Sequence, residues 1–315
     1  MKITVLDAAT LGSDLDLSLF STVGTPTIYD FSTASDIPER ISDADVVVTN
    51  KMKLNRSNLS GAKNLKLICV TATGYDNIDI EYCKKAGIQV SNIVGYSTNS
   101  VAQVTVATVL ELATHIREYN AFVTSGKYTE AGLANRVSPV FSELNGKTWG
   151  IVGLGNIGKK VASVAEAFGC RVIAFKRKPE EDYECVDLDT LCRESDIISL
   201  HLPLNDTTRS LIGKRELDMM KSNVILYNAA RGAVTDEAAV ADALMSRKIG
   251  AFGTDVYSFE PFPSDHPFNK IMALSNVCLT PHMAWASYEA RCLCVEEVVK
   301  NIDAYSHGIK RNAIV

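Results

Sequence analysis

The amino-acid sequence predicts an α/β protein made of two domains, each built on a parallel β-sheet. Short apolar runs typical of buried strands alternate with stretches of helical spacing, and this alternation favours parallel strands joined by helical crossovers. It occurs twice, first over residues 2–93 and again from Thr148 onward. A chain of 315 residues is also long enough for two domains of ordinary size.

The first domain is expected to contain a series of short strands. The clearest is Ala44–Asn50, where three consecutive valines suit a strand covered on both faces. Helical spacing between strands, as at Ile78–Ala86, provides the crossovers. The expected strands are Lys2–Asp7, Thr25–Asp30, Ala44–Asn50, Leu65–Thr71 and Ile88–Ile93.

A long helical pattern and an irregular arm follow. Asn99–Tyr119 is expected to form one helix, and its apolar first half predicts burial between domains or subunits. Gly126–Asn145 has weak periodicity and is expected to be an extended arm with a short helix. Together the helix and the arm predict a homodimer.

The second series of elements begins at Thr148. Strands are expected at 148–154, 171–175, 196–201, 223–228, 250–255 and 276–280, with helices at 156–168, 187–194, 213–221 and 236–248. The last helix, Ser287–Ser306, is expected to cross back and complete the first domain. The predicted domains are therefore 1–98 plus 286–315, and 99–285.

The glycine-rich stretch Thr148–Gly158, TWGIVGLGNIG, points to a dinucleotide site. An apolar strand runs into Gly153-x-Gly155-x-x-Gly158, and a helical pattern follows. In such a site the first glycine allows the tight turn, the second lets the backbone approach a pyrophosphate, and the third lets helix and strand pack closely. The helix N-terminus offers free N–H groups to the phosphates. The alternative is a tight glycine turn in an unrelated α/β protein.

Bulk properties exclude several classes of protein. A net charge of −5 and a pI near 5.6 argue against binding to nucleic acid or to an acidic membrane surface. No apolar stretch approaches the length of a membrane span, and the N-terminus lacks the pattern of a signal peptide. Eight scattered cysteines without metal-like pairs predict free thiols in a reducing cytoplasm and no metal site.

Polar side chains follow three expected strands, where ligands collect in open α/β sheets. Arg231 follows an apolar strand and suits a carboxylate bound in two-pronged fashion, although a surface salt bridge is the alternative. Glu260 lies in a proline-stiffened loop, and His282 follows Pro281. A histidine beside a glutamate forms an acid–base pair, whereas either alone is more often structural or solvated. His201 is a competing candidate, which we interpret as structural or next to the cofactor.

These stretches together resemble the D-isomer-specific 2-hydroxyacid dehydrogenases. Gly153–Gly158, Asn228–Gly232, Asp255–Pro261 and Thr280–His282 have the order and spacing of that family. Ala72–Asp79 resembles its substrate loop, and Asn99–Gln103 resembles the start of its interdomain helix. The stretch PHMAWA at 281–286, followed by Glu289-Ala290-Arg291, is most similar to the glycerate dehydrogenase/hydroxypyruvate reductase branch.

The resemblance implies a fold, a reaction and roles for residues. It implies two Rossmann-like/flavodoxin-like domains, with residues 99–285 binding the dinucleotide, the remainder binding substrate, and the active site in the cleft between them. A small 2-oxo acid of the hydroxypyruvate or glyoxylate type would be reduced to the D-2-hydroxy acid. His282 would be the general acid and base, Glu260 would keep it protonated, and Arg231 would bind the carboxylate.

The remaining contacts follow from the resemblance and from the glycine motif, except those of Lys176 and Arg177, which follow from the basic turn described below. Substrate contacts are expected at Thr73, Gly74, Tyr75, Arg231 and Trp285. Cofactor contacts are expected at Thr73, Gly153, Gly155, Asn156, Ile157, Gly158, Lys176, Arg177, Leu202, Ala229, Ala230, Arg231, Asp255 and His282.

The turn after Arg171–Phe175 departs from the NAD pattern. NAD sites place an acidic residue at the end of this strand to bind the ribose 2′-hydroxyl. Here the strand is followed by Lys176-Arg177-Lys178, whose cations could meet a 2′-phosphate. The sequence therefore favours NADP(H) slightly. NAD(H) stays possible if nearby acidic residues balance this basic turn.

A second class of function stays open on sequence grounds. Transcriptional corepressors related to this family sense dinucleotides on the same fold, and they can retain the Arg–Glu–His set. A third possibility is a relative that oxidises formate or phosphite. Glu260 weakens the formate version, because formate enzymes have a glutamine there.

Overall fold

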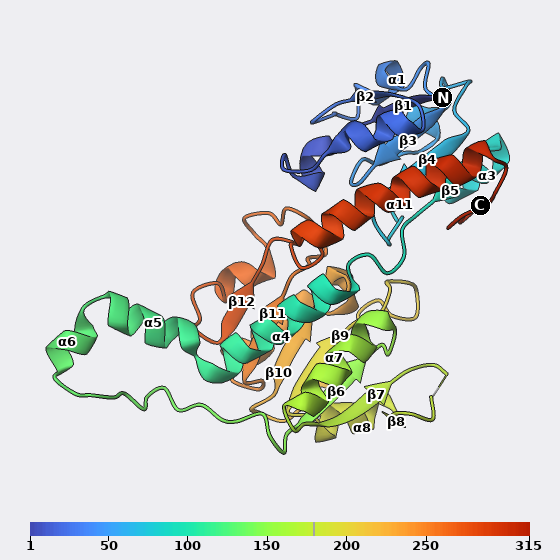
Figure 1. Cartoon of the computed structure of the whole chain (residues 1–315). Helices are drawn as coiled ribbons and strands as arrows, with labels where there is room; N and C mark the ends of the chain where they lie inside the picture. Colours follow the sequence, from blue (N-terminus) through green and yellow to red (C-terminus); the bar gives the residue numbers. More distant parts are fainter. Residues whose placement is uncertain (179) are drawn as a thin grey trace. The chain divides into compact units, whose positions relative to one another are not determined.

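A computed structural model describes residues 1–178 and 180–315 (Figure 1). The chain forms two compact units: unit 1 comprises Met1–Ser97 and Ala286–Val315, and unit 2 comprises Thr98–Trp285. Within the described residues, no helix combines the length and the apolar character needed to cross a bilayer.

Unit 1 is built on a five-stranded parallel sheet in the order β2-β1-β3-β4-β5. All four residues of β3 and all four of β4 are buried, which explains their uninterrupted apolar sequences. The strands are β1 (Lys2–Val5), β2 (Thr25–Ile28), β3 (Val46–Thr49), β4 (Leu67–Val70) and β5 (Gln89–Ser91).

Helices cover this sheet, and the longest comes from the far end of the chain. α11 (Tyr288–Ser306) begins at Ser287, whose side chain accepts a hydrogen bond from the Ala290 N–H. The Cys294 thiol donates to the Thr71 carbonyl at 3.4 Å, so α11 is attached at the carboxyl end of β4. The other helical segments are η1 (Ala8–Leu11), η2 (Leu17–Thr22), α1 (Ile37–Arg40), α2 (Arg56–Leu59) and α3 (Ile80–Ala86).

Unit 2 is built on a seven-stranded parallel sheet in the order β12-β11-β10-β9-β6-β7-β8. The chain leaves β6 on one side through β7 and returns on the other through β9. The crevice between β6 and β9 is therefore the topological switch point, where open α/β sheets bind ligands. The strands are β6 (Thr148–Val152), β7 (Arg171–Phe175), β8 (Glu184–Cys185), β9 (Ile197–Leu200), β10 (Ile225–Asn228), β11 (Ala251–Thr254) and β12 (Val277–Leu279).

Both faces of this sheet are buried. Ile151 packs in one apolar cluster and Val152 in another, because successive strand residues point to opposite faces. α4 (Thr98–Thr114) and α7 (Asn156–Ala167) contribute Val109 and Val161 to the first cluster. The second is lined by α8 (Leu188–Glu194), α9 (Lys214–Met219), α10 (Glu237–Met245) and η4 (Pro267–Lys270).

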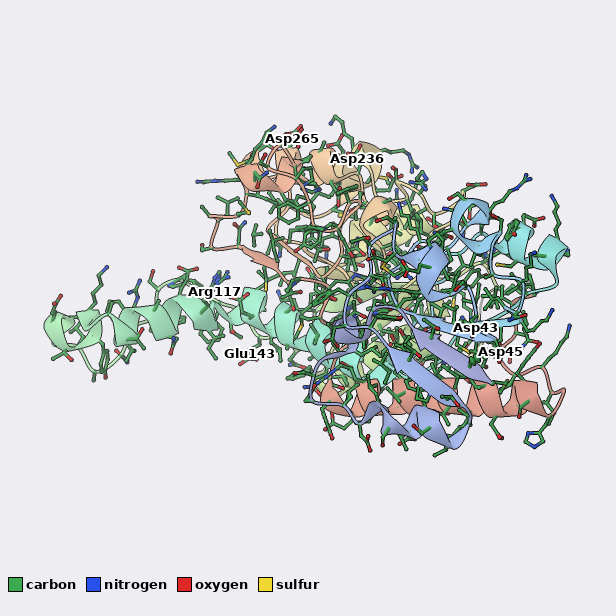
Figure 2. All side chains as sticks on the ribbon, turned by 90° about the horizontal axis from the view of Figure 1, so that it is seen from above. Asp43, Asp45, Arg117, Glu143, Asp236 and Asp265 are labelled. Carbon is green, nitrogen blue, oxygen red and sulfur yellow. The ribbon has the colours of Figure 1, made fainter. Side chains whose placement is uncertain are left out.

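The prediction of one helix over Asn99–Tyr119 is wrong. α4 ends at Thr114, His115 adopts a left-handed conformation with φ 53°, and α5 (Ile116–Thr124) starts in a new direction. Arg117 (labelled in Figure 2) lies just after the break, and its guanidinium donates to the Ser275 and Val277 carbonyls at 3.1 and 2.9 Å. These contacts attach the start of α5 to that segment. α5 and α6 (Lys127–Ala131) form an arm that extends away from the sheet of unit 2 (Figure 1).

Candidate active site

The glycine turn after β6 forms a cradle with open space in front of it. Gly153 has φ 99°, a conformation that L side chains rarely adopt, and a Cβ there would lie 2.6 Å from the His201 carbonyl oxygen. A Cβ at Gly158 would lie 2.3 Å from the Gly153 carbonyl oxygen. At Gly155, by contrast, a Cβ would meet no atom within 4 Å among the described residues. The backbone is thus open to a ligand at the middle glycine.

The first turn of α7 adds hydrogen-bond donors to that cradle. Within residues 1–178 and 180–315, no side chain caps this helix, and Gly155 and Asn156 are exposed. Ile157 is half-buried beside them. Uncapped N–H groups and the positive end of the helix dipole favour an anionic ligand such as a pyrophosphate.

His201 borders the same turn at the end of β9. Its backbone N–H donates to the Val152 carbonyl at 2.7 Å, and neither of its buried ring nitrogens has a hydrogen-bond partner among the described residues. Burial lowers the pKa of His201 to about 3, so the ring is neutral at pH 7. Leu202 follows it. An open glycine cradle, an uncapped helix and an orphaned imidazole fit a bound dinucleotide.

The basic turn after β7 is partly neutralised. Glu180 pairs with Lys176, and its other carboxylate oxygen lies 2.6 Å from Lys159 Nζ on α7. Arg177 and Lys178 are exposed. Among the residues that the structure describes, neither Arg177 nor Lys178 forms an ion pair with the protein, so cationic character remains at this turn.

The loop after β10 holds Arg231 in a tight turn. The Asn228 side chain accepts from the Ala230 N–H at 2.9 Å and donates to the Arg231 carbonyl at 3.0 Å. The half-buried Arg231 guanidinium donates to the Ala230 carbonyl at 2.8 Å. At Gly232 a Cβ would come within 1.9 Å of the Tyr257 carbonyl carbon, so this turn packs directly on the loop after β11.

Asp255, at the carboxyl end of β11, fixes the loop that carries His282. Its carboxylate accepts from the Thr280 hydroxyl at 2.7 Å and from the Met283 and Ala284 N–H groups, both at 2.8 Å. Burial raises the pKa of Asp255, while these hydrogen bonds oppose that shift. The sequence assigned Asp255 to the cofactor, and the structure also gives it this bracing contact.

Glu260 and His282 are in direct contact. Glu260 Oε2 lies 2.7 Å from His282 Nδ1, and Glu260 Oε1 accepts from the Tyr257 N–H at 3.0 Å. Their side chains are 33% and 25% exposed, so the pair is accessible but partly shielded from water. Because Nδ1 is engaged, Nε2 is the ring nitrogen available to a substrate oxygen.

Arg231, Glu260 and His282 follow β10, β11 and β12, which are adjacent parallel strands. The structure therefore places all three at the carboxyl edge of one sheet. Ala229 and Ala230 lie at the same edge, and half-buried Trp285 is the last residue of unit 2.

The predicted substrate loop belongs to unit 1. The Thr73 hydroxyl donates to the Ile93 carbonyl at 2.8 Å, and the Thr73 carbonyl accepts from the Asn92 side chain at 2.7 Å. Gly74 and Tyr75 follow, and Tyr75 is 37% exposed. These contacts fasten the start of the loop to the segment that follows β5 and leave the Tyr75 ring accessible.

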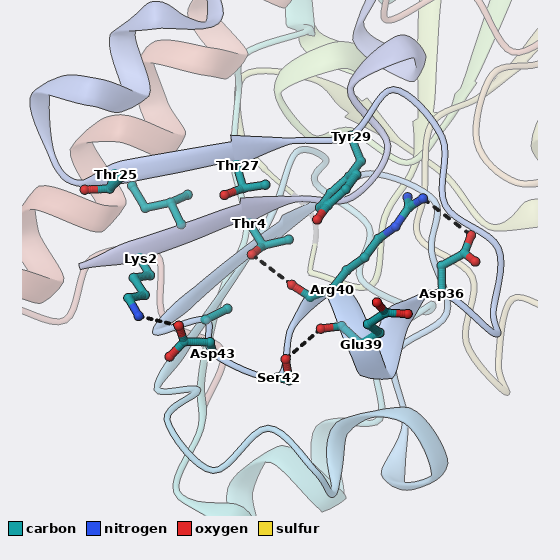
Figure 3. A pocket seen from close by; sticks show the side chains of 12 residues that line it. Lys2, Thr4, Thr25, Thr27, Tyr29, Asp36, Glu39, Arg40, Ser42 and Asp43 are labelled. Atoms are coloured by element: carbon teal, nitrogen blue, oxygen red, sulfur yellow. Dashed lines mark hydrogen bonds and ion pairs between the residues drawn. The ribbon is translucent and has the colours of Figure 1, made fainter.

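A second region of unit 1 forms a pocket of about 780 Å³ beside β1, β2 and α1 (Figure 3). Both cations of its lining have partners: Lys2 pairs with Asp43, and Arg40 with Asp36. Among the residues that the structure describes, this lining therefore has no unpaired cation to bind the carboxylate of a small acid.

Comparisons with known proteins identify the family. Residues 106–284 match the model of the "D-isomer specific 2-hydroxyacid dehydrogenase, NAD binding domain". The chain is 36% identical to a hydroxypyruvate reductase of Blautia hydrogenotrophica, covering 100% of this chain and 99% of that one. It is 41% identical to a glyoxylate reductase of Thermococcus litoralis, covering 86% and 83%.

A solved structure is also similar to this chain in fold and in sequence. An acyclic imino acid reductase in complex with NADPH and D-Arg has a TM-score of 0.88 and 30% identity, with all of both chains covered. These matches confirm the predicted two-domain α/β fold, the resemblance to the hydroxypyruvate reductase branch and a nicotinamide dinucleotide as cofactor. The chain therefore belongs to the D-isomer-specific 2-hydroxyacid dehydrogenases, and it is an NAD(P)-dependent oxidoreductase of 2-hydroxy and 2-oxo acids.

Proposed function

We propose that this enzyme reduces hydroxypyruvate or glyoxylate. Hydroxypyruvate would give the D-2-hydroxy acid, and glyoxylate would give its achiral 2-hydroxy acid. The observation that carries the proposal is the 2.7 Å contact between Glu260 and His282 at the sheet edge that also carries Arg231. The names of the hydroxypyruvate and glyoxylate reductases among its relatives support the substrate class.

The three side chains have complementary tasks in this proposal. NAD(P)H, when bound, supplies the hydride that reduces the substrate carbonyl. His282 donates a proton from Nε2 to the carbonyl oxygen, and Glu260 stabilises the protonated ring from the Nδ1 side. Arg231 binds the carboxylate with its planar fork and offsets the negative charge that develops on oxygen.

The other binding residues are proposed on the same basis. The cradle of Gly153, Gly155 and Gly158, with Asn156 and Ile157, would hold the pyrophosphate. Leu202, Ala229, Ala230 and Asp255 would line the rest of the cofactor site, together with Thr73, Arg231 and His282. The substrate contacts of Thr73, Gly74, Tyr75 and Trp285 rest on the family resemblance of their sequences.

We also propose that NADP(H) is preferred to NAD(H). Exposed Arg177 supplies a guanidinium at the turn where a ribose 2′-phosphate would lie. Glu180 works against this preference, because it already neutralises part of the charge of Lys176 and Lys159. The expected preference is therefore small.

The arm of unit 2, taken here as residues 116–141 so that it includes α5, α6 and the chain that follows them, supports a homodimer. Six large apolar side chains of this segment are more than half exposed: Ile116, Val123, Leu133, Val137, Val140 and Phe141. Exposed apolar side chains gathered on one projecting segment are typical of a protein interface. A second copy of this chain is the proposed partner.

The proposal is tested with His282→Ala and Arg231→Lys. Loss of the acid should lower kcat for hydroxypyruvate by about 10²- to 10⁴-fold while NADPH still binds, as measured by its fluorescence. Arg231→Lys should raise KM and lower kcat, so that kcat/KM falls by roughly 10- to 100-fold, because a point charge cannot replace the fork.

Asp265→Asn is a suitable control, since Asp265 is exposed and lies outside the proposed machinery. It should behave like the parent enzyme. Turnover that persists in His282→Ala would remove His282 from the role of acid, and near-normal kinetics of Arg231→Lys would remove Arg231 from carboxylate binding.

A further inference from the structure

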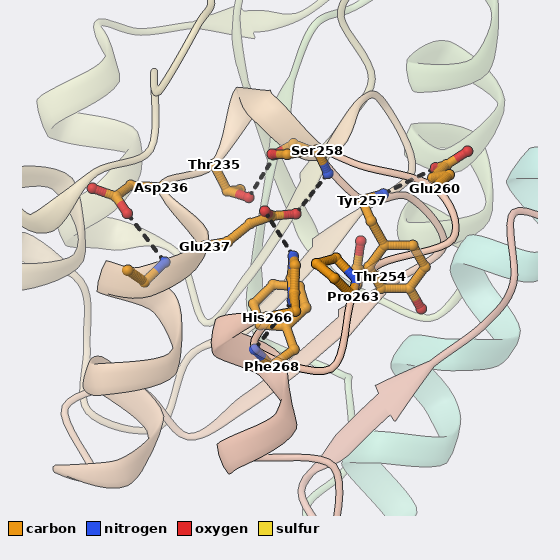
Figure 4. A network of polar contacts seen from close by, with 12 residues as sticks. Thr235, Asp236, Glu237, Thr254, Tyr257, Ser258, Glu260, Pro263, His266 and Phe268 are labelled. Atoms are coloured by element: carbon orange, nitrogen blue, oxygen red, sulfur yellow. Dashed lines mark hydrogen bonds and ion pairs between the residues drawn. The ribbon is translucent and has the colours of Figure 1, made fainter.

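A buried pair of ionisable side chains, Glu237 and His266, contacts the loop that carries Glu260 (Figure 4). Glu237 is at the start of α10, and His266 caps η4. Their side chains are only 8% and 6% exposed. Burying such groups is costly unless each polar atom has a partner, so the contacts of this pair indicate what it holds in place.

The contacts of His266 determine where its proton lies. Its Nδ1 accepts from the Phe268 N–H at 3.2 Å, so the ring proton must be on Nε2. Nε2 lies 3.0 Å from Glu237 Oε2 and donates to it. The imidazole is thereby fixed in one tautomer and one orientation.

The other oxygen of Glu237 holds the loop. Glu237 Oε1 accepts from the Ser258 N–H at 2.9 Å. The neighbouring Tyr257 N–H donates to Glu260 Oε1 at 3.0 Å, and Glu260 Oε2 contacts His282. A continuous series of polar contacts therefore runs from His266 through Glu237 and the 257–258 backbone to the proposed acid.

The His266 ring also packs near two aromatic rings, one from a residue before Glu260 in the chain and one from a residue after it. Its centroid lies 6.3 Å from that of Tyr257 and 4.7 Å from that of Phe262, and those two rings are 4.8 Å apart. Tyr257 and Phe262 flank Glu260 in the sequence. The Tyr257 hydroxyl donates to the Thr280 carbonyl at 2.9 Å, close to His282 in the chain.

We propose that Glu237 and His266 are positioning residues that hold Glu260 against His282. This inference rests on the proposed function, since it assumes that His282 is the acid. Without the pair, Glu260 would leave His282 for part of the time, and the protonated ring would then lack its carboxylate partner. The titratable and charged groups near this cluster include Tyr257, on which Asp255 and Cys278 act electrostatically, and Arg209 and Asp236, which line the same hollow as Glu237. The substitutions below leave all of them in place except Asp236, which is replaced only in the control.

The test compares Glu237→Gln and His266→Gln with the parent enzyme, Glu260→Gln and Asp236→Ala. Asp236→Ala is the matched control: Asp236 caps the same helix through the Ala238 and Ala239 N–H groups, so its loss should lower thermal stability without disturbing the loop. Hydroxypyruvate reduction with NADPH is measured across pH, together with NADPH affinity by fluorescence and the melting temperature.

Glu237→Gln and His266→Gln should each lower kcat about tenfold at pH 8, with little change in KM or NADPH affinity. On the alkaline side, the pH of half-maximal rate should fall toward that of Glu260→Gln. Asp236→Ala should melt earlier yet keep the parent pH profile. Should Glu237→Gln fail to fold, His266→Gln decides the question, because it retains a donor toward Glu237 and removes the ring.

Parent-like pH profiles in both variants, alongside a shifted profile in Glu260→Gln, would overturn this inference and leave the proposed function intact. Persistent turnover in His282→Ala would instead overturn the proposed function, and this inference with it.

Discussion

His282 combines its proposed role with a strained backbone. Its φ of 53° lies in the left-handed region, which costs a non-glycine residue about 1 kcal/mol or more. The strain persists because Asp255 holds the Met283 and Ala284 N–H groups and the Thr280 hydroxyl. In this conformation His282 Nδ1 lies 2.7 Å from Glu260 Oε2.

His201 gives a prediction at the same scale. The pKa of its buried ring is lowered to about 3, below the usual 6.5. Between these two values the unfolded chain binds a proton at His201 and the folded chain does not. The contribution of His201 to the free energy of unfolding is therefore fully present above pH 6.5 and is lost as the pH falls toward 3. Each pH unit in that window removes at most about 1.4 kcal/mol.

Urea unfolding of the cofactor-free protein from pH 7 to pH 4 measures this effect. His201→Gln should lose stability less steeply with falling pH than the parent, whereas His307→Gln, at a histidine whose side chain is 67% exposed, should follow the parent. Parallel curves for His201→Gln and the parent would contradict the prediction.

At the scale of elements, strand positions were predictable because each buried strand is a short apolar run. Val46–Thr49 and Arg171–Phe175 lie inside or at the predicted bounds. The break at His115 was not predictable, since Asn99–Tyr119 contains no glycine or proline and keeps helical spacing throughout. The contacts that Arg117 makes just after the break are with the 275–277 segment, which is far away in the sequence and gives no local signal.

For the candidate site, the residues that follow strands were predictable from the sequence, and the long-range contacts that hold them were not. Arg231, Glu260 and His282 could be placed after strands because each follows an apolar run. The pairing of Glu237 with His266 could not, because 29 positions separate them and neither lies in a local pattern. The bracing of the His282 loop by Asp255 likewise depends on a contact between strands that local sequence does not encode.

The basic turn after β7 gives a prediction at this scale. Replacing Lys176 and Arg177 with serine should raise the Kd for NADPH about tenfold or more and leave that for NADH nearly unchanged, because a hydrogen bond between charged groups contributes about 1.5–3 kcal/mol. Fluorescence titration measures both constants. Lys214→Ser, at an exposed lysine of α9, is the control. Equal weakening of both cofactors would exclude recognition of the 2′-phosphate.

For the whole molecule, the central expectation is assembly through the arm. Val137 and Val140 are 78% and 82% exposed, and charges placed there would be buried without partners in a dimer. Sedimentation velocity should show a dimeric parent and a mainly monomeric Val137→Asp/Val140→Asp double variant at micromolar concentration. Met245→Asp, at an exposed apolar residue of α10, should stay dimeric. A monomeric parent would contradict this expectation.

The most direct measurement is an assay of the purified protein with hydroxypyruvate, glyoxylate and pyruvate, each with NADH and with NADPH. We predict rapid oxidation of NADPH with hydroxypyruvate or glyoxylate, slower turnover with NADH, and a chiral D product from hydroxypyruvate. Turnover with NADH alone would keep the reductase and contradict the cofactor preference. No turnover with any of the three acids, while a dinucleotide still binds, would contradict the proposed substrate class.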